Sequence, residues 1–149
     1  MKNLFEQATL DEVLSRIDKL QPAAPRQWGK MDVAQMMAHC AITMDIASGR
    51  MNPPRLFLGR LLAPFFKSIM TNEKPFPKNG PTGKFLVVAD PRNFEREQKE
   101  LKEKIRQFSE GGEAGCTRHP HAFFGPMTPQ EWARGMYKHL DHHLRQFGA

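Results

Sequence analysis

Residues 128–147 read TPQEWARGMYKHLDHHLRQF, and the start of this stretch is strongly marked as a helix N-terminus. Thr128 stands at the capping position, Pro129 in the first turn, and Glu131 at the third position of a capping box. At about 100° per residue, one face of this helix combines apolar and imidazole side chains: Trp132, Met136, His139, Leu140, His143 and Phe147. The other face is expected to carry Arg134, Lys138, Asp141 and Arg145. We therefore predict an amphipathic helix whose histidines face a helical core.

Two further helices are predicted in the N-terminal part of the chain. The first is expected to begin at Thr9, which has Glu12 in the spacing of a capping box, and to end before Pro22. The second is expected to begin at Asp32, a capping residue with Gln35 three positions later. The inner face of this second helix is predicted to hold Val33, Met36, Met37, Cys40, Met44 and Ala47, with His39 on its flank.

A long connection is expected between Gly49 and Ala89. Residues 56–70 are mostly apolar, and we predict a helix there with a kink near Pro64. Residues 71–84 contain three prolines and two glycines, which favours a structured loop over a flexible linker. This connection is long enough to let the helices before and after it run in the same direction.

The remaining helix is predicted to open at Asp90-Pro91, with proline in its first position, and to stop at Gly111-Gly112. Residues 85–88 could be extended, but that run is too short to found a sheet. The fold class expected for the chain is therefore all-α: a four-helix bundle with one long crossover, with an extra helical segment in that crossover.

Composition limits the classes of protein to which the chain can belong. It has 149 residues, a net charge of +6 and two cysteines, Cys40 and Cys116, so we expect one domain over residues 1–149 and no disulfide scaffold. No apolar run approaches the roughly 18 residues of a membrane span, and no signal peptide is apparent, so a cytoplasmic protein that does not bind membranes is expected. The basic residues lie in mixed-sign stretches without interleaved aromatics, which argues against a nucleic-acid partner.

The histidines are the most informative side chains. His139 and His143 are four residues apart, so both lie on the core-facing stripe of the last helix, where two imidazoles can bind one ion. If the second helix lies beside the last one, His39 supplies a third ligand, and three protein ligands with one open position describe a catalytic metal site. The alternative is that these are core histidines satisfied by hydrogen bonds, because a histidine pair at this spacing also occurs by chance.

Other motifs argue against several enzyme classes. Leu140 stands where a zinc-protease motif requires a glutamate after its first histidine, and neither a phosphate-binding glycine loop nor a serine nucleophile elbow is present. Cys40 is expected to be a packing residue. His119 and His121 flank Pro120 in a loop and are left out of the predicted ligand set.

Three blocks of the sequence resemble the DinB/YfiT-like proteins, a superfamily of metalloenzymes. The first is WGKM-VAQM-AHC within residues 28–40, the second is NEKPFPKN at 72–79, and the third extends from FFG at 123–125 through EW at 131–132 to HLDHH at 139–143. Together they are similar to a bacterial branch of that superfamily that is classed as a domain of unknown function. The resemblance covers essentially the whole chain.

The resemblance implies a DinB-like four-helix bundle that binds a divalent metal through His39, His139 and His143. Zinc and nickel suit such an imidazole-rich site, with iron and manganese as alternatives. Characterised relatives include S-transferases and an isomerase that use low-molecular-weight thiols, and others are candidate hydrolases. We therefore expect a metal-dependent enzyme, a thiol S-transferase or a hydrolase, acting on a small-molecule substrate with or without a thiol cofactor; a homodimer is left open. The rival hypothesis is a non-enzymatic helical bundle, a stress-associated binding or dimerisation protein, in which the histidines only pack.

Overall fold

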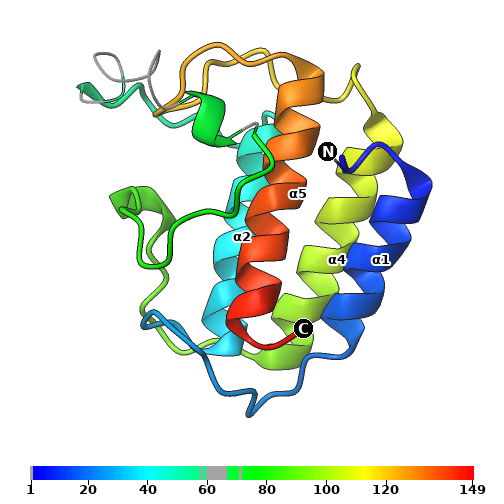
Figure 1. Cartoon of the computed structure of the whole chain (residues 1–149), viewed down its shortest axis with the longest axis vertical. Helices are drawn as coiled ribbons and strands as arrows, with labels where there is room; N and C mark the ends of the chain where they lie inside the picture. Colours follow the sequence, from blue (N-terminus) through cyan, green and yellow to red (C-terminus); the bar gives the residue numbers. More distant parts are fainter. Residues whose placement is uncertain (1, 58, 60–66, 71) are drawn as a thin grey trace.

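The computed structural model describes residues 2–57, 59, 67–70 and 72–149 of the chain. These residues form helices joined by loops, without a β-strand among them, so the predicted all-α class is confirmed. The named helices (Figure 1) are α1 (Gln7–Asp18), α2 (Val33–Ala47), the short 3-10 helix η1 (Lys84–Leu86), α4 (Phe94–Gly111) and α5 (Pro129–Gln146).

The two helices that carry the candidate site begin where the sequence predicts. At the start of α2 the Asp32 carboxylate accepts a hydrogen bond from the Gln35 amide at 2.8 Å, and the Gln35 side chain accepts one from the Asp32 amide at 3.0 Å. Thr128 and Glu131 make the same reciprocal pair at the start of α5. The N-termini of both helices are therefore fixed by capping boxes that can be recognised in the sequence.

Two predicted helix starts are wrong. The first helix begins at Gln7 instead of Thr9, and Thr9 donates its hydroxyl to the Glu6 carboxylate instead of capping. The buried Leu4 donates its amide to the Ala133 carbonyl of α5 at 3.3 Å, so the chain is already docked on α5 before the helix begins. Tertiary docking therefore moves this helix start.

The start of α4 also differs from its prediction, and here the cause is a different capping residue. The prediction placed it at Asp90-Pro91, but the helix begins at Phe94 because the Asn93 side chain accepts the Arg96 amide at 2.8 Å. The Asp90 carboxylate is engaged instead with Arg92, at 3.0 Å.

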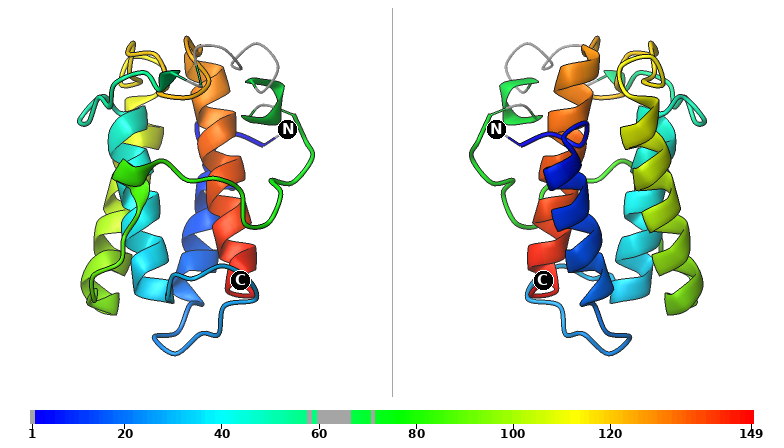
Figure 2. Two further views of the ribbon diagram at one scale, coloured as in Figure 1. Left: turned by 90° about the vertical axis from the view of Figure 1, so that its left-hand side faces the viewer. Right: turned by 90° about the vertical axis from the view of Figure 1, so that its right-hand side faces the viewer.

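The long helices pack side by side, and the long connection joins two that run in the same direction, as its length allows. In Figure 1, α1 and α5 run downward while α2 and α4 run upward, so the helices on either side of the connection are parallel. α2 packs most extensively on α4 and also contacts α5, and α1 contacts both α4 and α5. Figure 2 shows residues 72–90 running across the outer side of α5 and α2. The pairing of α2 with α5 brings the predicted histidines into reach of one another.

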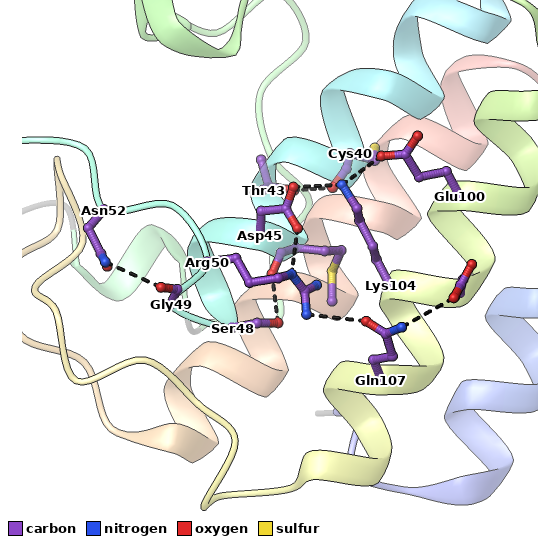
Figure 3. Close-up of polar contacts among 12 residues, drawn as sticks. Cys40, Thr43, Asp45, Ser48, Gly49, Arg50, Asn52, Glu100, Lys104 and Gln107 are labelled. Atoms are coloured by element: carbon purple, nitrogen blue, oxygen red, sulfur yellow. Dashed lines mark hydrogen bonds and ion pairs between the residues drawn. The ribbon is translucent and has the colours of Figure 1, made fainter.

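Polar contacts fix the parallel α2–α4 pair along its outer edge (Figure 3). The Asp45 carboxylate of α2 accepts from Lys104 of α4 at 2.6 Å and from Arg50 at 2.7 Å. Arg50 also donates to the Gln107 side chain of α4 at 3.3 Å. Inside this edge the core is apolar and includes the fully buried Met37, Met44, Ile105 and Leu140.

The crossover differs from its prediction in one part and is only partly described in another. Residues 84–86 form the 3-10 helix η1 instead of extended chain, and Val87, which follows it, is extended. Residues 67–70 are helical, but most of the helix expected over 56–70, with its kink near Pro64, lies outside the described residues. No helix in the described part of the chain is long and apolar enough to cross a membrane.

Candidate metal centre

Three imidazoles from two helices meet inside the bundle. His39 comes from α2, and His139 and His143 come from consecutive turns of α5. Their ligand nitrogens all lie within 4.8 Å of one another, and the Nε2 atoms of His39 and His139 are 3.0 Å apart. His39 and His143 are buried, whereas His139 keeps partial exposure. The structure therefore brings together all three residues that the sequence analysis selected.

The crossover fixes the tautomer of His39. The Nδ1 atom of His39 lies 2.8 Å from the Leu86 carbonyl oxygen in η1. Because a carbonyl can only accept, Nδ1 carries the proton, and the neutral ring keeps a lone pair on Nε2. The 3-10 turn of the crossover thus orients the first imidazole of the cluster.

Gln146 fixes the tautomer of His143. The Gln146 amide nitrogen donates to the Trp28 carbonyl at 2.7 Å, which leaves its oxygen facing His143 Nδ1 at 2.8 Å. His143 therefore donates from Nδ1 and also keeps its Nε2 lone pair. Gly29 makes this contact feasible: it has φ of +80°, and a Cβ there would lie 2.5 Å from the Gln146 amide nitrogen.

Thr43 can orient His139 in the same sense. The Thr43 hydroxyl donates to the Cys40 carbonyl at 2.7 Å (Figure 3), so its oxygen is free to accept from Nδ1 of His139 at 3.4 Å. The neutral His139 ring has one proton, which it can donate either from Nδ1 to this oxygen or from Nε2 to His39 Nε2, 3.0 Å away. In the first of these tautomers all three rings present an unprotonated Nε2 to one another.

The convergence of three lone pairs gives the cluster its chemical character. When the His139 proton is on Nδ1, the Nε2 atoms of His39 and His139, 3.0 Å apart, repel each other unless a cation lies between them. A proton is a poor solution, because burial lowers the pKa of each ring, in His143 to about 3, and the neighbouring imidazoles lower that of His139 further. Two nitrogens bound to one tetrahedral zinc ion at about 2.05 Å lie about 3.3 Å apart, close to the observed spacing. The donor set fits a divalent transition metal.

No carboxylate or thiol joins the three imidazoles within the described ranges. Asp141 points away, as predicted, and pairs with Arg16 at 2.8 Å and Arg145 at 2.9 Å. Cys40 is buried in the core, and burial raises the pKa of its thiol, which agrees with a packing role. An ion held by three imidazoles would have room for a further, small-molecule ligand.

Lys138 contradicts its prediction. Instead of lying on an outer polar face it is buried, and its ammonium donates to Ile69 and to the carbonyl and side-chain oxygens of Asn72, the last two at 3.0 and 2.8 Å. It also lies 4.6 Å from the centre of the Phe76 ring. The crossover covers this face of α5, which sequence periodicity alone cannot indicate.

Loop residues 72–79 reach the edge of the cluster. Phe76 packs against the half-buried His142 with ring centroids 6.0 Å apart, and Trp28 packs against the same ring at 5.4 Å. The Lys78 ammonium lies 4.5 Å from the Trp28 ring centre. The loop, the Trp28 segment and α5 thus meet beside the three imidazoles.

His119 and His121 do not join the cluster, in agreement with the prediction that excluded them. His119 donates from Nε2 to the Pro53 carbonyl at 3.1 Å. Nδ1 of His121 accepts the Phe123 and Phe124 amides at 3.0 and 3.1 Å.

The orienting residues were missed by the sequence analysis, and only one had a usable signal. Gln146 lies three residues after His143, a spacing at which helical side chains meet. Thr43 lies four residues after His39, and its contact with His139 depends on how α2 meets α5. Leu86 acts through its backbone carbonyl, which no side-chain pattern can reveal.

Comparison with known proteins yields a family but no characterised relative. A family model described as "Protein of unknown function (DUF1569)" matches residues 2–149. No curated protein and no solved structure matches the chain. The match extends over both site helices and the crossover between them, and the chain therefore belongs to the DUF1569 family.

Proposed function

We propose that this DUF1569 chain is a divalent-metal-dependent enzyme with a DinB-like four-helix bundle. His39, His139 and His143 hold the ion through Nε2, and the fourth position receives a small molecule. The reaction is either transfer of a low-molecular-weight thiol to an electrophile or hydrolysis.

One observation carries this proposal. Leu86 and Gln146 hold His39 and His143 with their Nδ1 protons engaged, and Thr43 offers an acceptor to Nδ1 of His139, so three Nε2 atoms can turn lone pairs toward one ion. Oriented imidazoles whose other nitrogen is hydrogen-bonded are typical of metal ligands.

The meeting of the three resemblance blocks supports the DinB-like assignment. They are far apart in the sequence, yet Trp28 contacts His142 and, through its carbonyl, Gln146, while Phe76 contacts His142 and Lys138. Part of each block therefore lies beside the candidate site.

In such a site, some residues would bind the metal and others would form the surrounding surface. The three rings would hold the ion because Leu86, Thr43 and Gln146 lie against their Nδ1 atoms, and Phe76 and Trp28 pack against the neighbouring His142. Once bound, the metal would lower the pKa of a thiol or water and make it a nucleophile near neutral pH. Zinc and nickel fit this imidazole set, with iron and manganese as alternatives.

Metal content of ligand variants tests the proposal. We expect about one transition-metal ion per chain in protein purified without a His tag or added metal. His139→Ala and His143→Ala should lose the ion, whereas His119→Ala, which changes a histidine outside the cluster, should keep it.

The rival, a non-enzymatic binding or dimerisation protein, predicts no metal in any of these proteins and no change in melting temperature with a chelator. A loaded wild-type protein then enters screens for thiol transfer to electrophiles and for hydrolysis, with His139→Ala as the inactive control.

A further inference from the structure

Three hydrogen-bond donors gather where the loop before α5 meets the start of the crossover. They belong to Arg55, His121 and Trp132, which we call the donor cluster. His121 and Trp132 are in ring contact, with centroids 5.3 Å apart. The Arg55 guanidinium lies on the backbone of Gly125, where an added Cβ would sit 3.4 Å from both terminal nitrogens.

Backbone hydrogen bonds hold this region in place. His121 and Gly125 exchange amide-to-carbonyl bonds of 2.9 and 3.0 Å across a tight turn. The Leu56 amide donates to the Ala122 carbonyl at 2.9 Å, and this contact holds Arg55 against the same turn. The positions of the donors are therefore set by the fold.

The turn also determines which nitrogen of His121 is a donor. Its Nδ1 atom accepts the amides of Phe123 and Phe124, so Nδ1 has no proton. The neutral ring then carries its proton on Nε2.

Arg55 and Trp132 lack acceptors for buried donors. Arg55 Nε and Trp132 Nε1 are both inaccessible to solvent, and neither has a hydrogen-bond partner among the residues that the structure describes. Arg55 also forms no ion pair within the described ranges. Leaving a buried donor unsatisfied is costly, and such groups call for an explanation.

We propose that the donor cluster is a binding site for an oxyanion, the carboxylate or phosphate group of a small molecule. An oxyanion accepts several hydrogen bonds at once, and a guanidinium beside neutral N–H donors matches that need. This site does not depend on the metal, so it stands apart from the proposed function.

The site lies on the same helix as the imidazoles. Trp132 and His139 are seven residues apart on α5, which corresponds to about 10 Å along the helix axis.

Titration with simple anions tests this site. The chain has two tryptophans, so two indole N–H resonances report on it, with Trp28 as the internal reference. Metal-free protein is titrated with inorganic phosphate and, separately, with acetate, at a constant ionic strength set by chloride. We expect saturable movement of the Trp132 resonance, and the stronger of the two probes identifies the class of anion.

Arg55→Gln should weaken this binding at least tenfold, because a charge-assisted hydrogen bond is lost. Arg118→Gln is the matched control: it removes an equal charge from an exposed residue near the same loop and should change binding less than twofold.

Two results would overturn the proposal: no saturable shift of the Trp132 resonance with either probe, or equal effects of Arg55→Gln and Arg118→Gln. The first would mean that water satisfies the donors, and the second that only net charge matters. The titration of the unmodified chain decides the first point even if Arg55→Gln fails to fold.

Discussion

Substitutions of Gln146 test whether its hydrogen bond to His143 raises the metal affinity of the site, because they leave the His143 side chain itself unchanged. Gln146→Met keeps the shape of the side chain but removes both the acceptor for His143 Nδ1 and the donor to the Trp28 carbonyl. Removing an orienting partner of a metal-bound histidine typically costs 10–100-fold in metal affinity, or about 1.4–2.7 kcal/mol. The two broken hydrogen bonds also leave buried groups unsatisfied, so we expect the metal-free protein to lose about 2–4 kcal/mol of unfolding free energy.

Gln146→Glu provides the contrast. A glutamate still accepts from His143 Nδ1, and its negative charge makes the imidazole a better ligand, but it cannot donate to Trp28. The metal-free protein should therefore be destabilised much as in Gln146→Met, while zinc affinity should equal or exceed that of the wild type.

Competition with a chromophoric zinc chelator measures the affinity of all three proteins, and urea unfolding after metal removal measures their stability. If both variants lose zinc affinity in proportion to lost stability, Gln146 acts only through folding and the orienting role is refuted. Equal zinc affinity in Gln146→Met and the wild type would refute it as well.

Three further predictions follow from the contacts around the cluster. In metal-free protein, burial lowers the pKa of His121 to about 4 and of His143 to about 3, so below about pH 6.5 only the unfolded chain takes up these protons. Unfolding free energy should thus fall by about 2 kcal/mol per histidine between pH 7 and 5, and His143→Gln should flatten the urea-midpoint profile; an unchanged profile would contradict the buried neutral state. Gly29→Ala places a Cβ 2.5 Å from the Gln146 amide at a positive φ, so it should cost about 1–2 kcal/mol in urea unfolding and also weaken zinc binding; a neutral result would refute the close approach. Lys138→Met should cost about 2–4 kcal/mol in the same urea assay, whereas the exposed control Lys99→Met should cost less than about 0.5; similar losses would show that the crossover is not held by Lys138.

Capping motifs and helical periodicity in the sequence correctly predicted the features that depend on neighbouring residues alone. The capping boxes at Asp32 and Thr128 set the starts of α2 and α5, and helical periodicity placed His139 and His143 on the inner face. The length of the crossover allowed α2 and α4 to run in parallel, and the structure shows that they do, with α5 beside α2. These features needed no knowledge of distant contacts.

Features that depend on distant contacts could not be predicted in this way. Helical periodicity places Lys138 on the surface, but its ammonium is buried and donates hydrogen bonds to the carbonyl oxygens of Ile69 and Asn72. Leu4 moves the start of α1 by docking on α5 first. The orientation of His39 depends on a backbone carbonyl of the crossover. Each of these requires the path of a loop, which side-chain patterns do not encode.

The most direct test of the central claim is X-ray absorption at the metal edge of the zinc-loaded protein. We predict a four-coordinate ion with three imidazole nitrogens at about 2.0–2.1 Å, and a first shell that loses one imidazole in His39→Ala. A first shell with sulfur at about 2.3 Å, or a spectrum unchanged by the His39, His139 and His143 variants, would contradict the proposal that three Nε2 lone pairs converge on one ion.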